Sequence, residues 1–457
     1  MNRPGRLVVT GFLLLLVGLA LFSLLHKKEP EEARPYFTIY LLGGSTAKGE
    51  PYDPELDIAK LAAYAYDDQI AGRPVRTVNL GQYGISIHDV ITVLGKVRND
   101  ADAVLLYSGN NEFQPFDTRH NLALRARQLF DRASVTQDQH EEVLRHYEKS
   151  IDKIVDHFES RDIPLFLCTV AVNVCDWEPN RSVLKDPAHG PRIEALLNAG
   201  DRSLADQQLE DACTAYREIV SMEPTFALGH QRLADCYRRM RKLKKAHEHY
   251  REAIDLDGNP GRVIRKQNEA IRRIARERNV PLVDVVEILE TASADRLIGF
   301  DMMRDNCHPT LKGYALIAEG FARELKARLN LQTGWHALDP DDIMNHFGLG
   351  NPFWLKVAMT SGQYCYVSSS LTFNRAHRLD RARYYLADAE AIAPSDVDLL
   401  CNIAVMNTMA GDIKEARASW RKAHAVDAEV TRTRLIHPRV RELMKGLGID
   451  NPLSIIR

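Results

Sequence analysis

Two short polar segments, far apart in the chain, carry the residue types that nucleophilic catalysis needs. Gly43-Gly44-Ser45 places a hydroxyl after a sharp turn, and Asp305-Asn306-Cys307-His308 places a carboxylate three residues before an imidazole. A histidine can remove the proton of a serine hydroxyl, and an aspartate can hold the ring in one tautomer. Ser45, His308 and Asp305 are therefore candidates for a nucleophile, a base and an orienting acid.

Two further segments carry glycine and asparagine, which can stabilise a developing negative charge. One reads Asn79-Leu80-Gly81-Gln82-Tyr83-Gly84 and the other Ser108-Gly109-Asn110-Asn111-Glu112. Backbone N–H groups at turns and an asparagine amide can hold an oxyanion. Each segment alone is unspecific, because glycine pairs and paired asparagines often form plain turns or helix caps. The order of all four segments together favours one shared site.

The elements that must position these segments are short apolar strands alternating with helices. Strands are predicted at 37–42, 74–80, 101–107, 163–170 and 280–283. Helices are predicted at 54–70, 87–97, 139–160, 263–277 and 310–329. This alternation is typical of an α/β fold, a parallel sheet with helices on both faces. Each polar segment follows a strand, and such sheets bind ligands at that edge.

A repeat pattern interrupts this alternation at 185–258 and returns near the carboxyl end. Small and aromatic residues recur there at about the 34-residue spacing of tetratricopeptide repeats. In the insertion they are Ala212, Tyr216, Pro224, Ala227, Leu233, Ala234, Tyr237, Ala246, Tyr250 and Ala253. Near the carboxyl end they are Ala382, Pro394, Leu400, Ala404, Gly411, Ala416, Trp420 and Ala423. Generic helical hairpins are the alternative.

The place of the insertion suggests a role at the site. Two repeats per cluster are too few for a free-standing solenoid, so both clusters should pack on the sheet domain or on each other. The insertion is expected to border the mouth of the site, with a remote partner-binding module as the alternative. The interval 335–372 has no clear period and receives no role.

The amino-terminal residues have the pattern of a membrane anchor. The run 7–25 is apolar and about as long as a bilayer core requires. It lacks the small-residue cleavage site of a secretory signal peptide, which favours an uncleaved anchor. We therefore expect an anchor at 1–28, a tether at 29–35, and a single-pass membrane protein with its bulk outside the cytoplasm, periplasmic in a bacterium. Basic residues flank both ends, so the orientation is weakly specified.

Composition limits the other classes of function. The 60 Lys and Arg nearly balance the 62 Asp and Glu, so no basic footprint for nucleic acid exists. The seven cysteines are odd in number and show no CxxC spacing, which does not indicate a zinc site. A disulfide such as Cys168–Cys175 stays open at this stage.

The four polar segments resemble, in their order, the blocks of the SGNH (GDSL-type) hydrolases. This resemblance implies a three-layer, flavodoxin-like parallel sheet and a nucleophile at Ser45. It implies an oxyanion hole formed by Ser45, Gly84 and Asn111, with Gly81 as the alternate glycine. It implies no metal and no organic cofactor. The chain departs from the family at Gly44 and at residue 112, a glutamate, because the family usually has Asp at both positions.

The sequence thus predicts a membrane-anchored serine hydrolase that acts on ester bonds, by hydrolysis or by acyl transfer. Its hydrolase parts would be 36–184 and 259–332, separated by the insertion 185–258 and followed by a helical region with repeats at 333–457. The substrate would be an acylated small molecule, glycan, lipid or peptide, and the repeats could bind a protein. The alternative is a membrane-tethered repeat scaffold with a vestigial hydrolase fold.

Overall fold

The computed structural model describes residues 34–113, 135–372 and 375–456. Within these residues, six strands form one sheet in the order β2-β3-β1-β4-β5-β6. The strands are β1 (Phe37–Gly43), β2 (Gln69–Ile70), β3 (Arg73–Asn79), β4 (Ala103–Tyr107), β5 (Leu165–Cys168) and β6 (Leu282–Val283). All pairs are parallel except β2 with β3. The five parallel strands have the flavodoxin-like order, as expected.

The central strands β1, β4 and β5 are mainly apolar because both faces of the sheet are covered there, whereas β3 near the edge is polar and half-buried. Every residue of β1 and β4 is buried, as in parallel sheets generally. In register, Ile39 lies opposite Ala103 and Leu41 opposite Leu105. β6 comes from 259–332 and pairs with β5 from 36–184, so the two parts of the chain that flank the insertion share one sheet.

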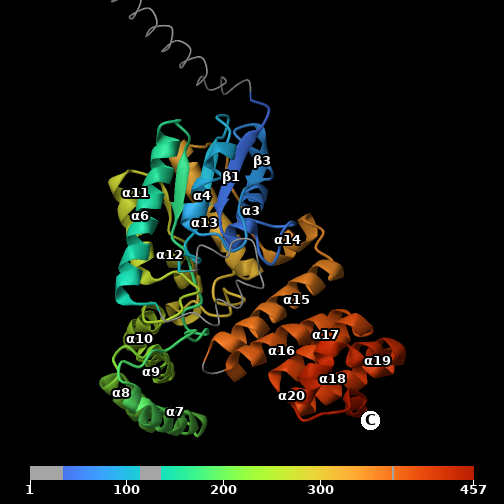
Figure 1. Cartoon of the computed structure of the whole chain (residues 1–457). Helices are drawn as coiled ribbons and strands as arrows, with labels where there is room; N and C mark the ends of the chain where they lie inside the picture. The colour runs from blue at the N-terminus through green and yellow to red at the C-terminus, as the bar shows by residue number, and fades with distance from the viewer. Residues whose placement is uncertain (1–33, 114–134, 373–374, 457) are drawn as a thin grey trace, which may run out of the picture.

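Helices cover the sheet in two layers (Figure 1). One layer holds α3 (Ile58–Tyr64) and α13 (Leu311–Leu329), with α12 (Val285–Ala292) packed on α13. The other holds α4 (Ile87–Ile91), α6 (Gln137–Glu159) and α11 (Arg265–Glu277). The expected α/β fold is therefore confirmed.

The prediction of a helix at 54–70 is wrong at the carboxyl end. Helix α3 stops at Tyr64, and the chain then forms the edge strand β2. Asp67 and Asp68 have φ values of 53° and 57°, and Ala71 has 50°. These left-handed residues cannot continue a helix, so they turn the chain into a tight hairpin with β3.

The insertion folds as helical hairpins below the sheet domain in Figure 1. Its helices are α7 (Gly190–Ala205), α8 (Leu209–Met222), α9 (Ala227–Arg239) and α10 (Leu243–Asp255). Consecutive helices pack on each other around their own apolar cluster. A Cβ at Gly200 would lie 2.4 Å from Tyr216 Cε1, so the small residue lets the ring fill the gap between helices. This is the small-against-aromatic packing that the repeat pattern predicts.

The carboxyl-terminal region is also helical. It contains α14 (Pro340–His346), α15 (Asn351–Ser368), α16 (Arg375–Ile392), α17 (Val397–Ala410), α18 (Ile413–Val426), α19 (Ala428–Ile436) and α20 (Pro438–Gly446). Ala404, Ala416 and Trp420 are fully buried between α17 and α18, as a repeat hairpin requires. The interval 335–372, which received no predicted role, forms α14 and α15.

One buried arginine ties these helices to the sheet domain. Arg378 of α16 has no exposed surface. It donates hydrogen bonds to the backbone oxygens of Glu178 and Ser368, and its guanidinium lies 4.4 Å from the centre of the Trp177 ring. Since Glu178 and Trp177 follow β5, the contact fixes the carboxyl-terminal helices next to the carboxyl edge of the sheet.

The expected membrane localisation must be corrected. The run 7–25 and the anchor predicted at 1–28 lie outside the described residues. Among the helices that the structure does describe, none combines the length and apolar character needed to cross a membrane.

Candidate active site

Ser45 sits on a sharp strand-to-helix turn at the carboxyl end of the central strand. β1 ends at Gly43, whose φ is 146°, and the short helix α2 (Ser45–Lys48) begins two residues later. A Cβ at Gly43 would lie 1.9 Å from the backbone oxygen of Tyr107 in β4. Only glycine fits at position 43. The turn it allows places Ser45 at the carboxyl edge of the sheet.

The loop before α13 brings His308 and Asp305 to this serine. Ser45 Oγ lies 2.8 Å from His308 Nε2, and His308 Nδ1 lies 2.8 Å from Asp305 Oδ2. The other oxygen of Asp305 accepts the backbone N–H groups of Cys307 and His308, each at 2.9 Å. Asp301, the other nearby carboxylate, instead accepts the N–H of Gly299.

These contacts set the protonation of the ring. Because Asp305 accepts the hydrogen on Nδ1, the neutral ring presents Nε2 to Ser45 as an acceptor. Burial of the ring opposes its protonation, but the negative groups around it, Asp305 first, outweigh this effect. The pKa of His308 is therefore raised well above its ordinary value of 6.5.

Asn111 and Gly84 line the same cavity as Ser45 and His308. The Asn111 amide donates to the backbone oxygen of Ile85 at 3.1 Å. A Cβ on Gly44 would lie 3.1 Å from Asn111 Nδ2, so the amide lies against the turn that carries the serine. Both residues therefore lie beside the serine in one cavity.

The alternate residues have other contacts. The amide oxygen of Asn110 accepts the N–H of Val263 at 3.1 Å, and Asn110 is buried. The N–H of Gly81 donates to Asn79 Oδ1 at 2.8 Å. Neither Asn110 nor Gly81 is among the described residues that line the cavity.

Glu112 joins the second and third segments. Its Oε1 accepts the N–H of Ile87, the first residue of α4, at 2.9 Å. The side chain is buried, and burial raises its pKa to about 8. The glutamate at this position therefore fixes the loop before α4 against the asparagines.

The cavity has a volume of about 510 Å³ and walls from three parts of the chain. Trp177 and Asn180 come from the segment before the insertion and Asn259 from the segment after it. Thr360 and Tyr364 come from α15. The Tyr364 ring meets the His308 ring edge-on, with centres 5.4 Å apart.

This lining corrects the expectation that the inserted repeats border the mouth. Among the described residues that line the cavity, none falls within 185–258. The two segments that flank the insertion lie side by side instead. Asn180 Nδ2, before the insertion, donates to the backbone oxygen of Asn259, after it, at 2.8 Å. The outer wall is supplied by α15, whose side chains the sequence did not connect with the site.

The structure also adds Glu50, which sequence reasoning missed. Its Oε2 lies 3.4 Å from His308 Nε2. The only signal in the sequence is its place directly after the turn that carries Ser45, in Gly49-Glu50-Pro51.

Asp305, Cys307 and His308 also form a cluster of potential metal ligands, with donor atoms within 4.8 Å of one another. Both oxygens of Asp305 already accept N–H groups, so this carboxylate is engaged in hydrogen bonds within the loop and with the His308 ring. Burial raises the pKa of the Cys307 thiol, which keeps its sulfur protonated. All seven cysteines of the chain are buried and free, so the disulfide left open at Cys168–Cys175 is not formed.

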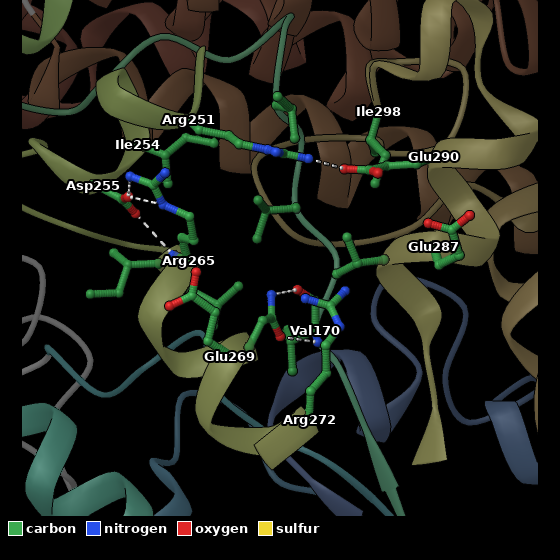
Figure 2. Close-up of a pocket in the computed structure, with 16 residues that line it drawn as sticks. Val170, Arg251, Ile254, Asp255, Arg265, Glu269, Arg272, Glu287, Glu290 and Ile298 are labelled. Atoms are coloured by element: carbon green, nitrogen blue, oxygen red, sulfur yellow. Dashed lines mark hydrogen bonds and ion pairs between the residues drawn. The ribbon is translucent and has the colours of Figure 1, made fainter. Parts of the chain in front are cut away.

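A second hollow of about 260 Å³ lies between α10 of the insertion and α11 (Figure 2). Its floor is apolar, and ion pairs cross its rim, Arg265 with Asp255 and Arg251 with Glu290. No serine, cysteine or histidine is among the described residues that line it. The cavity at Ser45 is therefore the better candidate for chemistry.

Comparisons with known proteins agree with the two resemblances seen in the sequence. Residues 227–260 match the tetratricopeptide repeat, which confirms the predicted repeat at α9 and α10. No curated protein was found to match the chain.

Solved structures of an acylhydrolase, a GDSL-like lipase and an esterase are similar to this chain at low identity. A lipase/acylhydrolase from Enterococcus faecalis is 13% identical, covering 65% of this chain and 98% of its own, with a TM-score of 0.34. A GDSL-like lipase from Bacteroides thetaiotaomicron is 9% identical, covering 66% and 93%, with a TM-score of 0.32. An acetyl xylan esterase is 12% identical, covering 62% and 98%, with a TM-score of 0.32. Such low TM-scores transfer no function, so the chemistry must be argued from the site itself.

Proposed function

We propose that the protein is a serine hydrolase that cleaves ester bonds through an acyl-enzyme on Ser45. The observation that carries this proposal is the continuous hydrogen-bonded line from Ser45 Oγ through the His308 ring to Asp305, with both links at 2.8 Å. Such a line activates an otherwise weak hydroxyl nucleophile. It opens into a cavity large enough for a small substrate.

The first half-reaction follows from this geometry. Ser45 Oγ attacks the ester carbon while Nε2 of His308 takes its proton. Asp305 stabilises the imidazolium that forms. The ring then gives the proton to the departing alcohol, which leaves the acyl group on Ser45.

The tetrahedral intermediate needs donors for its oxyanion. We assign this role to the backbone N–H groups of Ser45 and Gly84 and to the Asn111 amide. The bond from Asn111 to Ile85 orients the amide before substrate arrives. Pre-orientation matters because donors that need no rearrangement stabilise the transition state most.

A repeat scaffold with a vestigial hydrolase fold is the competing proposal. The tetratricopeptide match at 227–260 favours protein binding. A vestigial site has no reason to keep the two 2.8 Å links or the bonds that hold Asp305. The hydrolase proposal therefore accounts for more of the structure.

Ester turnover by purified protein tests the proposal. p-Nitrophenyl acetate, butyrate and octanoate should be hydrolysed at rates that depend on chain length, because the cavity is bounded by α15. Ser45→Ala should lower kcat by about 10⁴-fold or more, since members of a triad act as a unit. Activity above a tenth of the wild-type rate in that variant would remove Ser45 as the nucleophile.

A further inference from the structure

A second carboxylate faces the catalytic nitrogen of His308. Glu50 Oε2 lies 3.4 Å from Nε2, the same atom that lies 2.8 Å from Ser45 Oγ. The Glu50 side chain is 22% exposed, against 4% for Asp305, and it lines the cavity. In the triad proposed above, Asp305 contacts Nδ1 on the opposite side of the ring, and Glu50 has no assigned role.

The backbone of Glu50 is held close to the nucleophile. Its N–H donates to the backbone oxygen of Ser45 at 3.1 Å. The hydroxyl of Tyr314 lies 3.0 Å from the carbonyl oxygen of Glu50 and 2.8 Å from that of Thr46, so these two oxygens share its single hydrogen. The turn of Ser45 and the residue Glu50 therefore form one fixed unit, which places the carboxylate before any substrate binds.

The ionisable groups that act on the pKa of Glu50 are His308, Asp305 and Asp53. Burial raises its pKa, His308 lowers it, and Asp305 and Asp53 raise it. From α15, Lys356 lines the cavity and pairs with Glu55 at 3.5 Å. The carboxylate that meets His308 Nε2 is that of Glu50. Asp53 of the same loop also lines the cavity, but its carboxylate accepts the hydroxyl of Tyr83.

We propose that Glu50 positions the water that removes the acyl group from Ser45 and thereby favours hydrolysis over transfer to alcohols. This inference rests on the function proposed above. The attacking oxygen must approach Nε2 from the cavity, where the Glu50 carboxylate lies. A water molecule has two hydrogens, so it can give one to Nε2 and donate the other to Glu50.

The step balances with residues already in place. The water oxygen forms a bond to the acyl carbon while Nε2 takes one water proton. The bond from that carbon to Ser45 Oγ then breaks, and Nε2 returns the proton to Oγ. A monohydric alcohol has one hydroxyl hydrogen, which must go to Nε2, so it gains nothing from Glu50. Glu50 is on this account a positioning residue.

The test is the partition of the acyl-enzyme between water and methanol. Wild type and variants are given p-nitrophenyl acetate in buffer containing methanol, and methyl acetate and free acetate are measured. Glu50→Leu removes the acceptor and should raise the ratio of methanolysis to hydrolysis about fivefold or more. Glu50→Gln keeps an acceptor oxygen without the charge and should give a smaller rise. Glu55→Gln, which removes a carboxylate that faces Lys356, should leave the ratio unchanged.

An unchanged ratio in Glu50→Leu would overturn the inference. If Glu50 acts only by its charge on His308, both Glu50 variants shift the pH profile equally and neither changes the ratio. The burst of p-nitrophenol reports acylation separately. A burst in wild type that is lost in Ser45→Ala supports the hydrolase proposal whatever the ratio shows, so the two claims can fail independently.

Discussion

One carboxylate oxygen of Asp305 holds the His308 ring, and the other holds the His308 backbone. Oδ2 lies 2.8 Å from Nδ1, and Oδ1 lies 2.9 Å from the backbone nitrogen of the same residue. A spacing of three residues allows both contacts at once. The aspartate therefore fixes the tautomer of the ring and the shape of the loop that presents it.

This double contact predicts the effect of Asp305→Asn. The asparagine can keep the loop contact through its oxygen, but an amide facing Nδ1 favours the wrong tautomer of the ring. We expect kcat to fall by about 10⁴-fold with the fold retained. Asp301→Asn is the matched control, because Asp301 contacts Gly299 and not the ring. A silent Asp305→Asn together with a severe Asp301→Asn would contradict the assignment of the acid.

The raised pKa of His308 predicts the pH dependence of kcat/KM. The base must be neutral, and a raised pKa means that the ring stays protonated to higher pH. The profile should therefore rise through one ionisation with its midpoint above 6.5 and then level. Glu50→Gln should move the midpoint down, since one of the negative neighbours is removed. A midpoint below 6.5 in wild type would show that burial outweighs the carboxylates.

Substitution of Asn111 and of Asn110 should affect kcat to different extents. Asn111→Ala should lower kcat by about 10²–10³-fold, as loss of an oxyanion donor does. Asn110→Ala should change kcat much less but should cost about 1–3 kcal/mol of stability, because the buried N–H of Val263 loses its acceptor. Steady-state kinetics and chemical denaturation measure the two effects. The reverse ranking in kcat would move the third segment by one residue.

The raised pKa of Glu112 predicts that the folded protein becomes less stable as the pH rises from about 4.5 to 8. The folded pKa of about 8 lies above the ordinary 4.5, so the contribution of Glu112 is fully present below 4.5 and is lost as the pH rises through 8. Glu112→Gln cannot ionise and keeps an acceptor for Ile87. It should be more stable than wild type by about 4 kcal/mol near pH 8 and by less than about 1 kcal/mol near pH 5. Denaturation curves with equal differences at both pH values would contradict this.

The sequence predicted the central strands well because they are buried on both faces. The run 37–42 is apolar except for Thr38, and it forms β1 (Phe37–Gly43). The structure brings together the three residues that the sequence singled out, Ser45, His308 and Asp305, because a serine after glycine and an aspartate three residues before a histidine are patterns visible in the sequence. Glycine at 43, required by the contact with Tyr107, is part of the same signal.

The walls of the cavity could not be predicted in this way. Helix α15 buries one face, but that face mixes Phe353 and Val357 with Ser361, Gly362 and Ser368, so the sequence shows no clear apolar period there. Its contact with the site depends on tertiary placement, in which Tyr364 reaches the His308 ring. Glu50 was missed for a similar reason, since a glutamate in a loop carries no signal until His308 is placed beside it.

Labelling with a fluorophosphonate probe tests most directly whether His308 activates Ser45 as a nucleophile. Intact mass and peptide mapping after labelling should show a single adduct on the peptide that contains Ser45. The adduct should be absent in Ser45→Ala and form far more slowly in His308→Ala, while Cys307→Ala should label normally. Labelling of another residue, or equal labelling of wild type and His308→Ala, would contradict the proposed mechanism.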